Sequence, residues 1–345
     1  MTPSILIIYT GGTIGMQHNH ATGALSPLKF DRIETEMPEL RKFNLRIDTY
    51  SFEPPIDSSE VQPAFWVQLA RLIYSRYDSY DGFVVLHGTD TMSYTASAIS
   101  FMLENLAKPV VFTGSQLPVG LLRTDGKENL ISAIEIAAAA ADGRPCVPEV
   151  TILFNNQLYR ANRTTKYNAE QFRAFRSANY PPLAEIGVHI KYNPPFIHLP
   201  ENRDAPLRLY DTPDTNIAIL KIFPGIGRRV VEGILRIEEL RAVVLETYGS
   251  GNAPTAGWFI DTLREAIGRG LTILNVSQCH AGMVEMDKYE TGILLKQTGV
   301  ISGYDSTTEA AVTKLAVLLG QTTDTEAITA ALHTSLRGEI SPETH

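Results

Sequence analysis

The chain has 345 residues, of which 44% are hydrophobic and 20% are charged, and its formal net charge is -8 at pH 7. This length predicts two domains, or one domain with a large appendage, and this composition argues against a disordered or fibrous protein. Because the chain has no dense run of Lys or Arg, it lacks the charge pattern of a nucleic-acid-binding protein, and a small-molecule partner is expected instead.

The cysteines and the first apolar run indicate where the protein works. Cys146 and Cys279 are the only cysteines, and they fit neither a disulfide framework nor a zinc-ligand spacing, which predicts a reducing compartment. The apolar run at 5–9 is too short for a signal segment, and no run approaches the roughly 20 apolar residues that span a bilayer. The sequence therefore predicts a cytoplasmic protein without a membrane partner.

The first half of the chain alternates short apolar runs with longer helical patterns. The β-rich runs, which are typical of strands buried on both faces, are 5–9, 82–86, 109–112 and 150–154. Apolar residues recur with helical spacing at 63–77, 93–106 and 128–141. This alternation predicts a doubly wound, mostly parallel sheet.

A polar, proline-rich stretch at 191–213 predicts a linker, because it keeps no sustained hydrophobic period. The linker separates a larger domain, 1–190, from a smaller one, 214–345. The strands expected in the second domain are 217–222, 242–245 and 271–276, and the helices expected near its end are 307–319 and 325–336. We therefore expect two three-layer α/β domains, the larger at the amino end.

Turns rich in hydroxyl groups come after the predicted strands of the first domain. Open α/β sheets bind ligands at the carboxyl ends of their strands, and there the sequence reads TGGT, HGTDT and TGSQ after the first three strands, while the fourth leads on to NRTTK. The opening turn is neither GxGxxG nor a P-loop, so both nucleotide-binding fingerprints are missing. Taken alone, Gly11 and Gly12 need only form a tight turn, with Thr13 capping the segment after it.

Four residues of these turns together favour a hydrolytic site. Thr13, Thr89, Asp90 and Lys166 are all expected at one edge of the same sheet. A hydroxyl is a weak nucleophile unless a neighbour accepts its proton, and a lysine made neutral by burial can do so. Neither G-x-S-x-G nor H-E-x-x-H is present, so a serine-hydrolase or zinc mechanism lacks its motif.

Two further residues at strand ends have ordinary structural explanations. His87 is of the type that most often serves as a general base, but a histidine that ends a buried strand more often ties its ring to backbone groups. Cys279 has no basic neighbour in the sequence, so we expect a buried packing thiol rather than a nucleophile.

The motifs TGGTIG and HGTDTM resemble the signatures of bacterial-type L-asparaginases. The resemblance to the cytoplasmic type I branch continues through SFEPPIDSSE, KPVVFTGSQLP, FNNQLYRANRTTK, YGSGNAP and SQCHAG, and so covers essentially the whole chain. It implies hydrolysis of L-asparagine to L-aspartate and ammonia through a covalent acyl-enzyme, without a metal or an organic cofactor. It also implies a homodimer, usually paired into a tetramer.

The resemblance implies a role for individual residues. Thr13 is implied to be the primary nucleophile, and Thr89, Asp90 and Lys166 are implied to form a second triad. The residues implied to bind the substrate are Asp57, Ser58, Ser59, Thr89, Asp90 and Ser115, of which Ser115 lines the pocket for the side-chain amide. A bound zwitterion requires a carboxylate for its ammonium group and neutral donors for its carboxylate, and this set contains both.

The chain departs from the family pattern in two places. Many relatives carry a tyrosine in the loop after TGGTIG, whereas this loop reads HNHATGALSP. Some type I relatives use the tyrosine of a later G-Y-D motif, so Tyr304 is the candidate to assist Thr13, the alternative being an ordinary structural tyrosine.

Glu246 stands where a bacterial type I enzyme has an arginine that helps to bind an allosteric asparagine, and Cys279 matches the other wall of that site. Because an anion repels the effector's carboxylate, weak or absent substrate activation is expected.

The sequence leaves alternatives open. An amidotransferase subunit of the same superfamily frees ammonia for tRNA-bound amino acids, but such subunits carry an extra leading domain and a partner, whereas this chain starts directly at its first strand. A non-catalytic amino-acid sensor needs the pocket but not the full set of catalytic side chains. Nucleotide binding is the least supported function.

Overall fold

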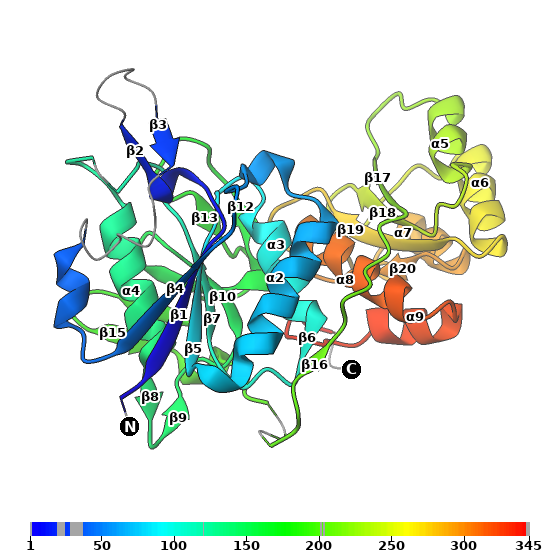
Figure 1. Ribbon diagram of the computed structural model, residues 1–345. Helices are drawn as coiled ribbons and strands as arrows, with labels where there is room; N and C mark the ends of the chain where they lie inside the picture. The colour runs from blue at the N-terminus through cyan, green and yellow to red at the C-terminus, as the bar shows by residue number, and fades with distance from the viewer. Residues whose placement is uncertain are drawn as a thin grey trace. The chain divides into compact units, whose positions relative to one another are not determined.

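The computed structural model describes residues 2–18, 25–27, 37–119, 121–200, 202 and 204–342. The chain divides into two compact units, Met1–Leu209 and Tyr210–His345, and each unit contains its own sheet and its own helices (Figure 1). No helix in the described part of the chain is long and apolar enough to cross a membrane.

The first unit is built on an eight-stranded sheet with the order β15-β14-β11-β10-β7-β5-β1-β4. Five neighbouring strands run parallel: β4 (Arg46–Ser51), β1 (Ser4–Tyr9), β5 (Gly82–Leu86), β7 (Val110–Thr113) and β10 (Val150–Phe154). The antiparallel strands are β11 (Gln157–Arg160), β14 (Ala184–Ile186) and β15 (Ile190–Tyr192). Because the chain adds β4 on one side of β1 and β5 on the other, the strand order reverses at β1, and such a reversal is where doubly wound sheets bind ligands.

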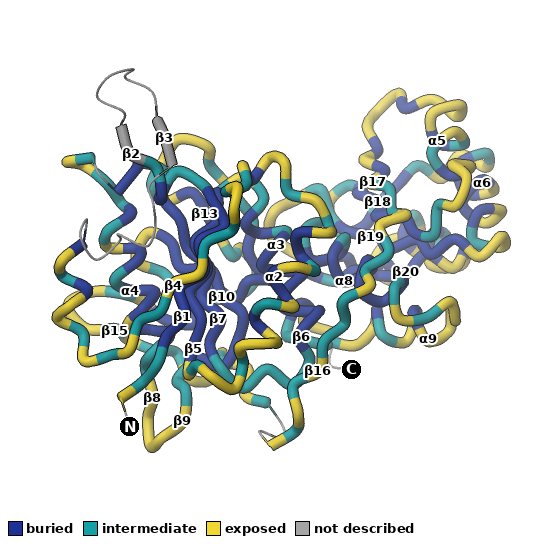
Figure 2. Tube along the Cα trace, viewed as in Figure 1, coloured by how far each residue is buried: buried dark blue, intermediate teal, exposed yellow. Residues whose placement is uncertain are grey.

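Helices cover both faces of this sheet. The helix α4 (Gly126–Ala138) lies on one face, and α2 (Pro63–Arg76) and α3 (Met92–Met102) lie on the other (Figure 1). The central strands are buried at every position except Ser4, the first residue of β1, as the dark tube in Figure 2 shows for β1, β5, β7 and β10. Strands covered on both faces are mainly apolar, as these are, and the arrangement confirms the prediction of a doubly wound, mostly parallel sheet.

Two features of the first unit differ from the sequence prediction. The edge strand β4 was not predicted, because its residues RIDTYS are only partly buried and do not form a continuous apolar run. The strand β10 turns back at Asn155 and Asn156, both of which have positive φ. Two such residues in succession suit a tight hairpin, so the chain returns antiparallel as β11 rather than continuing at the carboxyl edge.

The predicted linker, 191–213, contains residues that pair with the first unit. Tyr192 belongs to β15, and β16 (Arg208–Leu209) pairs with β6 (Leu103–Glu104), the short strand that follows α3. The other short strands of this unit are β2 (Met16–His18), β3 (Leu25–Pro27), β8 (Ala140–Ala141), β9 (Arg144–Pro145), β12 (Thr165–Lys166) and β13 (Phe175–Arg176).

The second unit contains a four-stranded parallel sheet. Its strands, in spatial order, are β17 (Ile217–Lys221), β18 (Ala242–Thr247), β19 (Thr272–Ser277) and β20 (Ile301–Ser302). Its helices are α5 (Arg228–Leu235), α6 (Gly257–Gly268), α7 (Glu290–Gln297), α8 (Thr308–Gln321) and α9 (Thr325–Leu332). Residues of α5, α6 and α7 pack into one hydrophobic cluster, and residues of α8 and α9 pack into another. The strands contribute alternate side chains to these two clusters, so this unit also has three layers, as predicted.

Candidate active site

The turn after β1 is pressed between the turns that follow β4 and β5. A Cβ atom on Gly11 would lie 2.0 Å from the carbonyl oxygen of Ile56, and one on Gly12 would lie 2.6 Å from the backbone of Gly88. Gly11 and Gly12 also have φ values of 137° and 86°, which L side chains rarely adopt. Only glycine fits these two positions, so the backbone of this turn packs directly against the backbones of Ile56 and Gly88 with no side chain between them.

Hydrogen bonds fix the same three turns to one another. The amide of Thr10 donates to the carbonyl of Leu86 at 3.0 Å, and the amide of Ile56 donates to the carbonyl of Thr10 at 2.8 Å. The hydroxyl of Thr91 donates to the carbonyl of Ser58 at 2.6 Å. The three motifs TGGT, IDSS and HGTDT, far apart in the sequence, therefore form one backbone platform at the strand reversal.

Thr13 stands at the start of a short 3-10 turn, Thr13–Gly15, and is half-buried. The hydroxyl of Tyr9 donates to the carbonyl of Gly15 at 3.2 Å and so supports this turn from the core side. Burial raises the pKa of Tyr9 to about 12, so its phenol stays protonated at neutral pH and acts as a support, not as a base. The loop residues 19–24 lie outside the described residues.

Lys166 connects the other members of the predicted triad. Its Nζ donates to the Oγ1 of Thr89 at 2.8 Å and to Oδ1 of Asp90 at 2.6 Å. The lysine side chain is 18% exposed, whereas that of Asp90 is 63% exposed. A hydroxyl, an amine and a carboxylate thus form a continuous proton path that runs from a sheltered position toward solvent.

Lys166 reaches Thr89 by a route that the sequence did not predict. It was expected to project from the same sheet edge as the other turns, but the chain first runs back along β11 and forms a 3-10 turn, Ala161–Arg163, that contacts α3. The lysine then lies on β12, whose partner is β13. Both that 3-10 turn and β12 contact α3, which begins two residues after Asp90, so packing on this helix brings the lysine to the HGTDTM motif.

The residues expected to bind the ends of the substrate lie on the turn after β4. Oδ1 of Asp57 accepts hydrogen bonds from the amide and the hydroxyl of Ser59, both at 2.9 Å. These two hydrogen bonds lower the pKa of Asp57 below its usual value, and the one from the Ser59 backbone amide contributes more than the one from its hydroxyl. This carboxylate is therefore charged at neutral pH and exposed. Ser58 beside it is buried, and a Cβ atom on Gly88 would lie 2.5 Å from the Ser58 hydroxyl oxygen.

Ser115 and its neighbour Gln116 follow β7. The buried Ser115 hydroxyl donates to the carbonyl of Leu117 at 2.6 Å, so the lone pairs of its oxygen and its backbone are the groups that it can offer to an amide. The side chain of Gln116 lies 3.5 Å from the hydroxyl oxygen of Thr89. Gln116 was not singled out from the sequence, although it stands in the TGSQLP motif beside Ser115.

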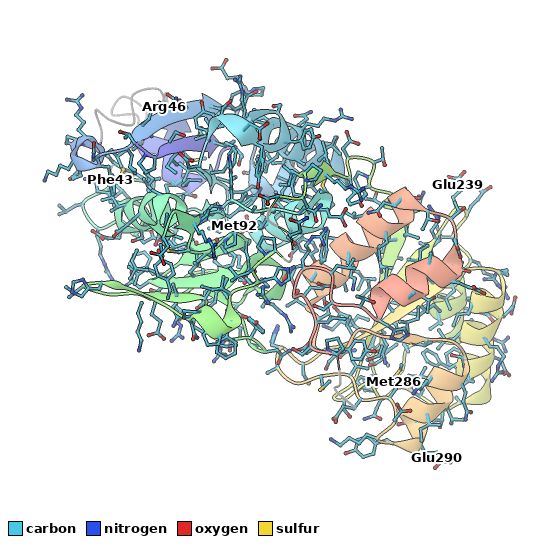
Figure 3. The ribbon with its side chains drawn as sticks, turned by 90° about the horizontal axis from the view of Figure 1, so that it is seen from below. Phe43, Arg46, Met92, Glu239, Met286 and Glu290 are labelled. Carbon is cyan, nitrogen blue, oxygen red and sulfur yellow. The ribbon has the colours of Figure 1, made fainter. Side chains whose placement is uncertain are left out.

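His87 has the structural role that the sequence favoured. Its Nδ1 lies 2.7 Å from the carbonyl oxygen of Gly88, so we assign the proton to this nitrogen. The ring is fully buried and contacts the rings of Phe65 and Phe112. Burial lowers its pKa to about 4, so the imidazole is neutral throughout the physiological range. Met92, which begins α3 and lies inside the same unit in Figure 3, packs nearby against the Gly114 position.

Tyr304 belongs to the second unit and adopts an unusual conformation. Its φ is 52°, which is a genuine outlier for a bulky side chain. Its hydroxyl forms a 2.9 Å hydrogen bond with Nδ1 of His333. Burial, and to a smaller extent the charges of Lys314 and Lys296, lower the pKa of His333. The neutral imidazole can therefore accept a hydrogen bond from the phenol of Tyr304. Strained residues of this kind cluster at functional positions.

Glu246 and Cys279 lie at the ends of neighbouring strands of the second unit. Glu246, near the end of β18, accepts a hydrogen bond from the hydroxyl of Thr308 at 2.7 Å and pairs with Lys221 at 3.2 Å. Cys279 is exposed, so the expectation of a buried packing thiol was wrong. The physical reason is its place: β19 ends at Ser277, and Cys279 lies in the turn beyond it, with its amide bound to the Ser277 hydroxyl.

In the described part of the chain, no three His, Cys, Asp or Glu side chains gather in a way that would hold a metal ion. The functional groups that the site does present are hydroxyls, an amine and carboxylates.

Comparison with known proteins identifies the family. Residues 4–197 match the family described as "Asparaginase, N-terminal", and residues 216–332 match "Glutaminase/Asparaginase C-terminal domain". L-asparaginase 1 of Escherichia coli (strain K12) is 45% identical over 347 residues, which cover 99% of this chain and 98% of that protein. The protein named 60 kDa lysophospholipase of Homo sapiens is 39% identical over 98% of this chain and 61% of its own length.

A solved structure agrees with these sequence matches. The crystal structure of L-asparaginase I from Vibrio cholerae superimposes with a TM-score of 0.90 at 40% identity, covering 99% of this chain and 100% of that one. The resemblance that TGGTIG and HGTDTM suggested is thereby confirmed. The chain belongs to the bacterial-type L-asparaginase family, in its type I branch.

Proposed function

We propose that this protein is an L-asparaginase, an amidohydrolase that converts L-asparagine to L-aspartate and ammonia through a threonine acyl-enzyme. The observation that carries this function is the hydrogen-bonded set of Thr89, Lys166 and Asp90 on the same platform as the Thr13 turn. Membership of the family and the near-complete alignment with L-asparaginase 1 support it.

The proposed reaction begins at Thr13. Its Oγ1 attacks the side-chain amide carbon of asparagine, its proton leaves with ammonia, and an aspartyl ester forms on the enzyme. Water then attacks the ester and aspartate departs. Thr89 and Lys166 relay the proton along their hydrogen bond, and Asp90 holds the lysine amine in position. We assign the tetrahedral oxyanion to backbone N–H groups of the Thr13 and Thr89 turns, where preorganised donors are most effective.

The two exposed carboxylates of Asp57 and Asp90 suit the ammonium group of the substrate. Asp57 and Asp90 are proposed to bind its ammonium group, and Ser58 and Ser59 to bind its carboxylate. The Ser59 hydroxyl, which donates to Asp57 in this structure, would turn to the substrate carboxylate when the substrate binds. Ser115 is proposed to line the pocket of the side-chain amide. The fixed charge of Asp57, whose pKa the Ser59 bonds lower, supports the first of these roles.

Tyr304 is proposed to assist Thr13, in place of the tyrosine that the loop after TGGTIG does not provide. Two observations support this role: the positive φ of Tyr304 and its hydrogen bond to the neutral His333. The variant Tyr304→Phe removes only the hydroxyl, so we expect a lower kcat with the fold retained. Full activity of this variant would leave Tyr304 as an ordinary structural residue.

The Glu246 position is proposed to weaken regulation by the substrate. Its carboxylate is already engaged by Lys221 and Thr308, and it presents an anion where an effector's carboxylate would need a cation.

We also propose a homodimer, or a dimer of dimers, located in the cytoplasm. Analytical ultracentrifugation and cell fractionation test these two points.

Ammonia release from L-asparagine tests the function directly. We expect turnover by the wild type and its loss by about 10⁴-fold or more in Thr13→Ala and in Thr89→Val, since removing one member of a catalytic unit costs about as much as removing all of it. Circular dichroism and thermal unfolding of both variants show whether the fold is intact. Tight asparagine binding by calorimetry with no ammonia produced by the wild type would instead favour a sensor, and full activity of both variants would refute the assigned mechanism.

A further inference from the structure

The side chain of Gln116 connects its own turn, which follows β7, with the turn after Lys166 and with the Thr89 turn. Its Nε2 donates to the carbonyl oxygens of Ala169 and Gln171, each at 3.1 Å. Its Oε1 lies 3.5 Å from the hydroxyl oxygen of Thr89. The first two contacts lie on the turn that follows Lys166, and the third lies on the HGTDTM motif, so one amide spans the two partners of the Lys166–Thr89 hydrogen bond.

The orientation of this amide is determined by its partners. A primary amide has two N–H donors, and here two carbonyl oxygens accept both of them. The flipped amide would place its oxygen against those two carbonyls, which is repulsive, so Oε1 must face Thr89. The Thr89 hydroxyl accepts from Lys166 at 2.8 Å, so its own proton is available for Gln116, whose Oε1 lies on its other side at 3.5 Å.

Both ends of Gln116 are held in place. Its backbone amide donates to both carboxylate oxygens of Asp125 at 3.1 Å, and the same carboxylate accepts from Leu117 at 3.2 Å. The turn that the Gln116 side chain contacts is also held by hydrogen bonds of its own: the backbone amides of Glu170 and Gln171 both donate to the side-chain oxygen of Asn168 at 2.8 Å. The amide thus connects two turns that are each rigid by themselves.

We propose that Gln116 is a positioning residue for the proton relay: it holds the turn after Lys166 against the Thr89 turn and keeps the Thr89 hydroxyl in the rotamer that accepts from the lysine. The 3.5 Å contact with Thr89 is long for an O–H···O bond, so the two carbonyl contacts are the firmer part of the connection. The inference rests on the proposed roles of Thr89 and Lys166 in the relay.

Three single variants test it. Gln116→Met keeps the length of the side chain but removes both hydrogen-bonding ends. Gln116→Glu keeps an oxygen for Thr89 but turns a second oxygen toward the two carbonyls. Gln171→Met is the matched control, because that residue is exposed and contributes only its backbone carbonyl to the contact.

We expect both Gln116 variants to lose about ten- to a hundredfold in kcat, at the lower end of what positioned acid-base groups contribute, with KM within about threefold of the wild type. The control should match the wild type in both constants. A tenfold rise in KM at unchanged kcat would show that Gln116 contacts the substrate and would overturn the proposal. So would wild-type kcat in Gln116→Met.

A double-mutant cycle with Lys166→Met separates positioning from general structural damage. If Gln116 acts through the lysine, Gln116→Met should lower kcat no further in the Lys166→Met background, because the interaction it supports is already absent. Additive losses would contradict the proposal. Full activity of Lys166→Met alone would instead refute the relay role proposed for Lys166, and absence of asparagine turnover in the wild type would refute the proposed function, so these failures are distinguishable.

Discussion

The parallel sheets of both units end in polar turns at their carboxyl edges, but these turns satisfy their charged groups in different ways. In the first unit Lys166 bonds a hydroxyl and a carboxylate that is mostly exposed, so a proton has a path to move along. In the second unit Glu246 is largely buried and engaged by Lys221 and Thr308. We call the carboxyl edge of the first sheet the reactive edge, because its side chains remain available for a reaction. We call that of the second sheet the saturated edge, because the Glu246 carboxylate is already bound to its neighbours.

Among the changes that compare the two edges, the largest effect is expected from removing the lysine at the reactive edge. Lys166→Met keeps the aliphatic stem but removes the amine that binds Thr89 and Asp90, so kcat should fall by about 10²- to 10⁴-fold, the usual contribution of a positioned acid or base. The matched change at the saturated edge, Lys221→Met, should leave kcat within about twofold. Steady-state ammonia assays measure both. Equal losses in the two variants would show that the contrast between the edges has no catalytic meaning.

A smaller effect is expected from disturbing the close backbone approach. Gly12→Ala places a Cβ atom 2.6 Å from the backbone of Gly88 at a φ of 86°, so we expect a loss of more than about tenfold in kcat/KM and destabilisation by a few kcal/mol. The control is Gly143→Ala, where φ is 72° and no atom lies within 4 Å. That variant carries the backbone strain without the clash, and urea unfolding should show a loss of about 1 kcal/mol with activity unchanged.

The buried His87 should make stability depend on pH. Its pKa is about 4 in the folded protein and near 6.5 when unfolded, so between these values only the unfolded chain binds the proton. The unfolding free energy contributed by this group is therefore complete above pH 6.5 and is lost as the pH falls toward 4. From pH 7 to pH 5 the loss is about 2 kcal/mol.

Urea unfolding of His87→Asn at the two pH values checks this expectation. Asparagine retains a donor for the Gly88 carbonyl but does not titrate, so the variant should show a smaller difference between pH 7 and pH 5 than the wild type. The exposed His189, changed to Asn, is the control and should behave as the wild type does. An unchanged pH dependence in His87→Asn would mean that other groups cause it.

The smallest effect is expected at Glu246. With its carboxylate occupied by neighbours, asparagine saturation of the wild type should be hyperbolic, and Glu246→Gln should keep kcat within about twofold. The exposed Glu238, changed to Gln, controls for the loss of one negative charge. Clearly sigmoidal kinetics in the wild type would show that a regulatory site operates despite the anion.

Regular patterns made the central strands and the residue motifs predictable from the sequence. The strands β1, β5, β7 and β10 are continuous apolar runs because both of their faces are covered, and the turns beyond them carry the family motifs. The edge strand β4 escaped detection because half of its surface meets solvent. Helix α3 ends at Met102, four residues earlier than its apolar pattern indicated, since Leu103 begins a strand.

The contacts within the site were harder to predict. Nothing local in the sequence shows that Asn155 and Asn156 reverse the chain, or that Lys166 comes to Thr89 across α3. The role of Gln116 depends on carbonyl groups of residues more than fifty positions away. Such contacts follow from the assembled sheet, whereas propensities and motifs describe only neighbours in sequence.

The hairpin at Asn155 and Asn156 has a consequence for how activity appears during folding. Because the chain passes through β10 and the hairpin to β11 before Lys166 reaches Thr89, 77 positions away, the relay is one of the long-range contacts of its unit. Contacts of this kind form late, since a large loop must close before they stabilise anything. Recovery of enzymatic activity after dilution from denaturant should accordingly lag behind recovery of helical signal, and turnover then reports the formation of this long-range contact.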